Sequence, residues 1–463
     1  MVGVYVDDLA IAAAKLETLA RFKNEMSKRY DMKDLGELHY ILGLQVKRDR
    51  EARSLHLSQK QYINTVLERF GMLHCKPIKS PLRSKAIMSL RKEGEEKTDR
   101  TRYLAAVGSL MYAMLGTRPD LAYPVGLLGR FASDPSETHW EGVLSVFKYL
   151  KHTSDLGIIY SGGNEQLDGY SDADFATSDV DRRRVTSGYV FRLWGGAISW
   201  QSKKQPSVSL ATGDAEYVAL AQASRELMWL RSIMSELGFA PDKPITLYGD
   251  NQASISIAKN PVGHTRAKQI DIRFHYLREL VERDIISIEY IATNSMLADG
   301  LTKPLAPVLF ARFLTMLGLV PITHRSIGRS AYLAMRSSDI IAESGITPHD
   351  LLACSAMTSP MTSFCSRSKD TSSDSDTSVW NGIPSEAPSI ENAPSIINPS
   401  AALAALDKAI LSLEVALDGK STRLAMIAAA ITLEDGSDRG GSNASSESDD
   451  SDDSDDSMAT DLA

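Results

Sequence analysis

Four acidic side chains in the middle of the chain have the residue type and the separate settings that phosphate chemistry with metal ions requires. Asp172 lies in the string Gly-Tyr-Ser-Asp, Glu216 in Asp-Ala-Glu-Tyr, Asp250 in Tyr-Gly-Asp-Asn and Asp299 in Leu-Ala-Asp. Carboxylates that converge from separate elements repel one another, and hard divalent cations relieve that repulsion by binding their oxygens. Two such ions about 3.5–4 Å apart hold both the attacking and the leaving oxygen of a phosphodiester. The four residues therefore predict a two-ion site for phosphodiester hydrolysis.

The elements around these acids follow an order that brings strand ends and helix starts to one crevice. The expected strands cover residues 169–175, 186–194, 196–201, 245–248 and 285–291, and the expected helices cover 214–237, 252–259, 274–283 and a short segment that carries Asp299. This order predicts a mixed α/β sheet with flanking helices. We expect Glu216 in the first turn of its helix, where the helix dipole favours a carboxylate. Taken singly, each acid is also a common cap or solvated residue, and only the set of four indicates a site.

The residues before this module predict a smaller α+β unit and a helical connection. Alternation of apolar residues predicts a hairpin over residues 2–11, with Asp7 and Asp8 near its turn. The other expected elements are helices over 15–29, 59–70, 103–115 and 136–152, and strands over 40–46 and 54–57.

Several strings in the α/β module closely resemble the ribonuclease H domain of copia-type retrotransposon polyproteins. They cover residues 169–176, 183–191, 198–205, 215–217, 250–252, 264–268, 270–273, 298–299 and 302–305, in collinear order over about 140 residues. The resemblance implies a ribonuclease H-like fold that hydrolyses the RNA strand of an RNA–DNA hybrid with two Mg²⁺ ions, or with Mn²⁺ in their place. It also implies that the metal-binding, catalytic carboxylates are Asp172, Glu216, Asp250 and Asp299.

The chain departs from the family pattern beside some of these residues. Asp214 stands in the turn before Glu216 where the family usually has a different string, and Gln269 stands where a histidine is common. Gly300 follows Asp299 in place of a usual isoleucine, and we expect it to loosen the backbone there and to weaken metal binding. His264, in the loop over 261–268, is a candidate for product release or proton transfer, and a structural histidine is an equal alternative.

Upstream, the string that ends in Asp7 and Asp8 resembles the palm signature of reverse transcriptases. Further copia-like strings follow at residues 32–36, 40–43, 57–59, 62–63, 70–72, 108–112, 117–120 and 149–151, so the resemblance spans about residues 1–305. Such polymerases use a third carboxylate from an earlier strand, and only six residues precede Asp7. The resemblance therefore implies a partial palm and thumb, a remnant of the polymerase motif that we do not expect to polymerise DNA.

The charge is unevenly distributed. Residues 434–463 hold eleven acids and one arginine, a charge of −10, so the net charge of −8 leaves about +2 for the rest of the chain. Basic clusters flank the acidic motifs, and we expect them to contact the phosphates of a hybrid without reading its sequence. An ordinary solvated surface is the alternative. The cluster residues are Arg182, Arg183, Arg184, Lys203, Lys204, Arg266 and Lys268.

Composition assigns the remaining segments. Ser, Thr, Pro and Asp dominate residues 355–399, which predicts disorder. Four leucines and Ile410 at three- and four-residue steps over 401–417 predict a short helix with a coiled-coil-like stripe of about two heptads. The predicted division is 1–84 partial reverse transcriptase palm and thumb, 85–166 connection, 167–306 ribonuclease H-like domain, 307–400 largely disordered linker, 401–433 helical segment and 434–463 acidic, disordered Ser/Asp tail.

Three cysteines without a CxxC pair favour a reducing, intracellular location, either a cytoplasmic particle or the nucleus. No apolar run reaches about 18 residues, so we expect no membrane partner. The expected partners are an RNA–DNA hybrid and either the rest of the polyprotein or a full polymerase subunit. Two alternatives to a hybrid-cleaving ribonuclease remain open. One is a catalytically inactive transposon remnant, and the other is an interaction protein that acts through its helical segment and acidic tail.

Overall fold

The computed structural model describes residues 2–5, 7–13, 15–82, 88–161, 166–175, 185–206, 209, 211–259 and 271–322. The predictions for the linker beyond 322, the helical segment 401–433 and the acidic tail lie outside the described residues. Among the helices that are described, none combines the length and the apolar composition needed to cross a lipid bilayer.

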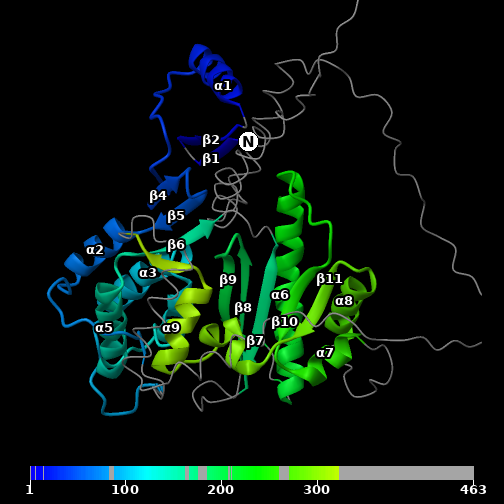
Figure 1. The fold of residues 1–463 in the computed structure, drawn as a ribbon. Coiled ribbons are helices and arrows are strands. Elements are labelled where there is room, and N and C mark those ends of the chain that lie inside the picture. The colour runs from blue at the N-terminus through cyan, green and yellow to red at the C-terminus, as the bar shows by residue number, and fades with distance from the viewer. Residues whose placement is uncertain are drawn as a thin grey trace, which may run out of the picture.

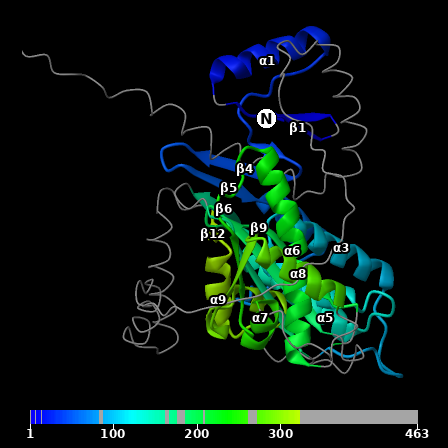
Figure 2. The ribbon, with the colours of Figure 1, turned by 90° about the vertical axis from the view of Figure 1, so that its right-hand side faces the viewer.

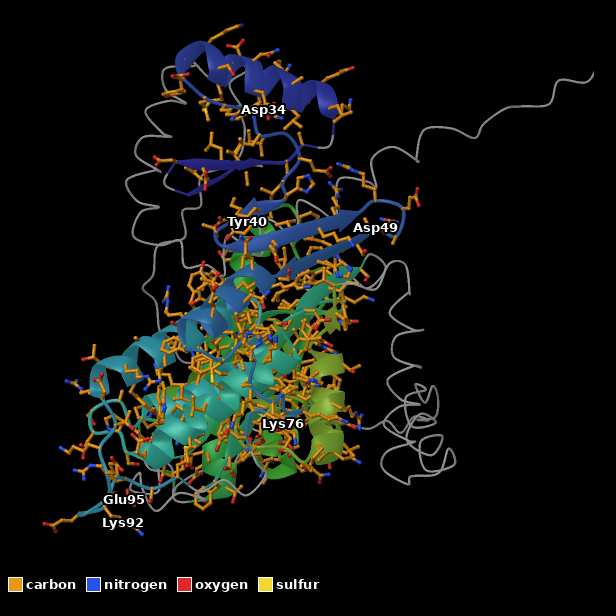
Figure 3. The ribbon with its side chains drawn as sticks, turned by 90° about the vertical axis from the view of Figure 1, so that its left-hand side faces the viewer. Asp34, Tyr40, Asp49, Lys76, Lys92 and Glu95 are labelled. Carbon is orange, nitrogen blue, oxygen red and sulfur yellow. The ribbon has the colours of Figure 1, made fainter. Side chains whose placement is uncertain are left out.

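The first elements form a lobe with no buried core. β1 (Val2–Tyr5) and β2 (Asp8–Ile11) pair antiparallel, and α1 (Leu16–Arg29) follows them. Figure 1 shows this lobe at one end of the molecule, and Figure 3 places Asp34 beside α1, where it accepts a hydrogen bond from Lys23 at 2.9 Å. None of the described residues before Ile41 is buried. The predicted hairpin and helix are therefore confirmed, but they contribute little to the core of the chain.

A second sheet joins three parts of the chain that are distant in sequence. Its strands run in the order β12 (Leu319–Pro321), β6 (Leu156–Ser161), β5 (Ser54–Ser58), β4 (Leu44–Asp49) and β3 (Tyr40–Ile41), all antiparallel. The prediction of one continuous strand over 40–46 is wrong. Leu42 and Gly43 adopt positive φ angles of 53° and 70°, so the chain turns there and β3 pairs back on β4.

Helices of the connection pack beside this sheet (Figure 1). They are α2 (Lys60–Arg69), α3 (Arg100–Gly116), α4 (Ala122–Gly129) and α5 (Glu137–His152). A short 3-10 turn, Pro119–Leu121, links α3 to α4. There the fully buried Arg118 donates two hydrogen bonds to Asp120, and Tyr149 of α5 donates one to the same carboxylate at 2.6 Å. The buried charge is thus paired and hydrogen-bonded, and the pair fixes the turn against α5.

The third sheet carries most of the predicted site. Its order is β11 (Ile286–Tyr290), β10 (Ile245–Gly249), β7 (Asp168–Asp174), β8 (Thr186–Leu193) and β9 (Gly196–Lys204). β7, β8 and β9 are antiparallel, whereas β10 and β11 run parallel to β7. α6 (Thr212–Glu236) packs along β7, β8 and β10, and α7 (Gln252–Lys259) and α8 (Asp271–Glu282) pack against α6 and β11 (Figure 2). The predicted mixed α/β fold with flanking helices is confirmed.

The segment after residue 306 begins with ordered structure, so the prediction of a linker is wrong for its first part. α9 (Pro307–Met316) buries Phe310, Phe313 and Leu314, and β12 then pairs with β6. One hydrophobic cluster of buried residues extends from Ile41 to Leu319. The connection and the third sheet therefore share a core instead of forming separate modules.

Candidate metal centre

Asp172 is held in the central strand of the third sheet. β8 and β10 flank β7 on its two sides, and the Asp172 side chain is only 3% exposed. The hydroxyl of Thr302 donates a hydrogen bond to Oδ2 of Asp172. The sheet and this hydrogen bond fix where the carboxylate lies.

Asp250 reaches the same place from the neighbouring strand. β10 runs parallel to β7 with Tyr248 opposite Tyr170, and Asp250 follows two residues after Tyr248. The parallel register therefore carries Asp250 alongside Asp172. Thr293 donates a hydrogen bond to Oδ2 of Asp250 at 2.8 Å.

Asp299 lies in η4, a 3-10 helix (Leu297–Leu301) that fits between β8 and α9 because of two glycines. A Cβ atom on Gly188 of β8 would lie 2.7 Å from Cβ of Leu301, and one on Gly300 would lie 2.7 Å from the ring of Phe313. Gly300 has no positive φ angle. Gly300 therefore has a packing role. Because it has no side chain, α9 can lie close against η4, which carries Asp299 next to the sheet. Its predicted effect on metal binding stays a prediction.

Glu216 comes from α6, but not from its first turn. α6 begins at Thr212, so the acid in the first turn is Asp214, and the predicted dipole stabilisation of Glu216 is wrong. Glu216 is 5% exposed, and its carboxylate accepts a hydrogen bond from the backbone N–H of Ala173.

Three of the four predicted carboxylates converge closely. Within the described part of the chain, Asp172, Asp250 and Asp299 each present an oxygen, and these oxygens all lie within 4.8 Å of one another. Glu216 is not among these three, but its charge interacts with both Asp172 and Asp250. The structure therefore forms an acidic triad, in which Asp172 and Asp299 are buried and Asp250 is half-buried, with Glu216 beside it.

The convergence of buried carboxylates raises their pKa values. Burial, and then the charge of Asp299, raises the pKa of Asp172 to about 7. Burial, and then the charges of Asp172 and Asp250, raises the pKa of Glu216 to about 9. Burial also raises the pKa of Asp299, although the ammonium of Lys303 opposes this effect. Holding these negative charges close together costs free energy of folding, and a bound cation would offset that cost.

The arrangement fits a divalent cation. Carboxylate oxygens are the ligands that hard cations prefer, and three of them lie close enough together to bind one ion. Oδ1 of Asp299 is buried, and the ammonium of Lys303 lies 2.9 Å away from it as an ion pair.

The other predicted site residues are not gathered here. Asp7 and Asp8 are exposed in the β1–β2 hairpin, in a different part of the fold from the triad. Lys203 is exposed and Lys204 half-buried at the end of β9. The remaining predicted contacts lie outside the described residues; they are Arg182, Arg183, Arg184, His264, Arg266 and Lys268.

Sequence reasoning assigned no role to three residues that the structure places at or beside the triad. Thr302 and Lys303 lie three and four residues after Asp299, a spacing that would bring them near it on a helical turn. Arg130, at the end of α4, donates a hydrogen bond to Thr186 at 2.9 Å. Thr186 pairs with Asp174 on β7, two residues from Asp172. No sequence pattern near the acidic residues indicates Arg130, because it belongs to the connection and is distant from them in the sequence.

Comparison of the chain with known proteins identifies a matching family model and several sequence relatives. Residues 1–84 match the family model described as reverse transcriptase (RNA-dependent DNA polymerase). The chain is 42% identical over 305 residues to the Pol polyprotein of transposon TNT 1-94 from Nicotiana tabacum, covering 65% of this chain and 23% of that protein. It is 33% identical over 229 residues to a putative transposon Ty5-1 protein of Saccharomyces cerevisiae, covering 49% of this chain and 73% of that protein.

A solved structure titled as LC11-RNase H1 in complex with an RNA/DNA hybrid matches with 14% identity and a TM-score of 0.24, over 30% of this chain and 94% of that one. The chain spans less than a quarter of the tobacco polyprotein that it matches. By its motifs and its sequence relatives, the chain belongs to the Pol polyproteins of copia-type retrotransposons.

Proposed function

We propose that the chain cleaves the RNA strand of RNA–DNA hybrids by hydrolysis at a two-metal site formed by Asp172, Glu216, Asp250 and Asp299. The observation that carries the proposal is the acidic triad, whose oxygens lie within 4.8 Å of one another. The ribonuclease H resemblance of the surrounding strings supports the choice of substrate, and Mg²⁺ is the expected ion.

Two bound ions would stabilise the charges on the attacking and leaving oxygens of the phosphodiester. The protein's own part is to position the ligands and to manage their protons. Thr302 orients Asp172 and Thr293 orients Asp250 through single hydrogen bonds. Burial raises the pKa of Glu216 to about 9, so this carboxyl group would hold a proton at neutral pH, and a bound cation would displace that proton.

Basic residues near the triad support a nucleic-acid substrate. Lys203 and Lys204 lie at the end of β9, and Arg130 bonds to Thr186, which pairs with Lys204 across the sheet. Phosphate contacts from such residues position a duplex without reading its bases. We infer that the connection thus takes part in holding the hybrid.

The polymerase motif supports the family assignment. Within the described residues, Asp7 and Asp8 are exposed and are not joined by a third carboxylate, since the triad is the one acidic group of metal-binding size found there. The alternative of an interaction protein depends on the helical segment and tail, which lie outside the described residues.

A hybrid-cleavage assay tests the proposal. The substrate is an RNA–DNA hybrid with labelled RNA, incubated with Mg²⁺ and the full chain, the variant Asp250→Asn or the control Asp242→Asn. Asp250→Asn keeps the side-chain shape but weakens a ligand, so we expect a loss of about a hundredfold or more, since metal ligation supplies several kcal/mol. Asp242 is exposed in the loop before β10, and its variant should keep full activity. Equal cleavage by the parent and Asp250→Asn would defeat the proposal.

A further inference from the structure

Lys303 brings a positive charge to the edge of the acidic triad. Its Nζ lies 2.9 Å from Oδ1 of Asp299, and the two side chains are 36% and 9% exposed, respectively. The charge of Lys303 also interacts with Asp172 and Asp174 on β7. One ammonium therefore faces carboxylates from two separate elements, η4 and β7.

Lys303 also lies beside the connection. Lys303 lines a cavity between the connection and η4 together with Tyr123 and Pro124 of α4 and Pro304. A lysine in such a place covers apolar surface with its methylenes and keeps its ammonium in polar surroundings. In this case the polar surroundings include the carboxylates of the triad.

The contact with Asp299 is an ion pair between a half-buried ammonium and a buried carboxylate. The ammonium of Lys303 lies 2.9 Å from Oδ1 of Asp299, within reach of a charge-assisted hydrogen bond, and this contact opposes the effect of burial on the pKa of Asp299. Asp299 is buried, but the Lys303 side chain is 36% exposed, so water can solvate the ammonium once it leaves the carboxylate. The same oxygen is the one that a divalent cation would need, so the ammonium and the cation compete for it.

We propose that Lys303 is a built-in counter-cation, which balances the acidic triad in the ion-free protein and competes with the first divalent cation for Asp299. The proposal rests on the metal site of the proposed function and adds a residue that sets its affinity. In the ion-free state, the ammonium reduces the repulsion among Asp172, Asp250 and Asp299. When a divalent cation binds, the ammonium leaves Oδ1 of Asp299.

Calorimetric titration with Mn²⁺ alone tests the proposal on the full chain. The variant Lys303→Met removes the charge and keeps most of the stem, and Lys243→Met removes the same charge from an exposed loop before β10. We expect Lys303→Met to bind Mn²⁺ about fivefold more tightly than the parent, the change that loss of one competing ion pair brings. Lys243→Met should bind like the parent.

Thermal unfolding in EDTA gives a second readout. Without its counter-cation, the triad of Lys303→Met should lower the Tm by a few degrees, and saturating Mn²⁺ should raise that Tm by more than it raises the Tm of the parent. If Lys303→Met does not yield folded protein, Lys303→Gln serves for both measurements.

Two results would overturn the inference in distinguishable ways. Mn²⁺ binding by the parent, with equal or weaker binding by the Lys303 variant, would refute the counter-cation role and leave the metal site standing. An absence of Mn²⁺ binding by the parent would defeat the metal site and the inference together.

Discussion

In the ion-free protein, we expect the free energy of unfolding to fall as the pH rises, because Asp172 and Glu216 lose protons that the fold holds. Their folded pKa values, about 7 and about 9, lie above the ordinary values of 3.8 and 4.5. The native state therefore binds more protons than the unfolded state between these limits. This stabilising effect is present at low pH and is lost as the pH rises through the folded pKa values.

Each group affects stability between its ordinary pKa and its folded pKa, and the size of the effect follows from the width of this pH window. Inside its window, each group lowers the free energy of unfolding by about 1.4 kcal/mol per pH unit. Between about pH 5 and pH 7 both groups lose protons in the folded state, so together they lower the free energy of unfolding by up to about 5 kcal/mol. That is a large share of the stability of an ordinary domain, about 5–15 kcal/mol.

Urea unfolding in EDTA at several pH values, for the parent and the double variant Asp172→Asn/Glu216→Gln, measures this effect. His56 acts in the opposite direction, because burial lowers its pKa to about 4. It is present in both proteins and cancels in the difference between their pH slopes. Saturating Mg²⁺ should restore most of the lost stability of the parent and little of that of the double variant. Equal pH slopes for the two proteins in EDTA would refute the reasoning.

Two further predictions concern the packing that positions the site. A chain that ends at residue 306 loses the buried side chains of α9 and β12, each worth about 1.5–3 kcal/mol, so it should fail to give a cooperative thermal transition, whereas a chain that ends at residue 322 should give one. Cooperative unfolding of both chains would show that α9 and β12 are dispensable. Gly300→Ala places a Cβ atom 2.7 Å from the ring of Phe313, and it should lower the free energy of unfolding by about 1–3 kcal/mol in urea. Gly213→Ala meets nothing within 4 Å and is the matched control, and equal stability of the two variants would contradict the packing argument.

The strands of the third sheet and the positions of its acids could be predicted from the sequence because each lies in a strongly patterned element. Asp250 directly follows an apolar strand, and the parallel pairing of that strand with β7 brings it to Asp172. What the local pattern does not contain is long-range pairing. The pairing of β5 with β6 joins residues about a hundred positions apart. It places strands from the predicted palm and thumb and from the predicted connection in one sheet.

The errors have local physical causes. The apolar spacing of Phe310, Phe313, Leu314 and Leu317 was present in the sequence, but the Ser- and Pro-rich composition further along favoured a linker. The turn within 40–46 depends on Leu42 at a positive φ angle, which its side chain does not predict. Lys303 is recognised only once η4 is folded, since its role depends on the charges of two other elements.

The location of bound cations tests the central claim most directly. Crystals of the full chain soaked with Mn²⁺ should show anomalous-scattering peaks bounded by Asp172, Asp250 and Asp299, with Glu216 reaching one of them. Two peaks about 3.5–4 Å apart are the predicted result. A map in which Mn²⁺ binds elsewhere, or in which the triad holds no ion at saturating Mn²⁺, would contradict the account.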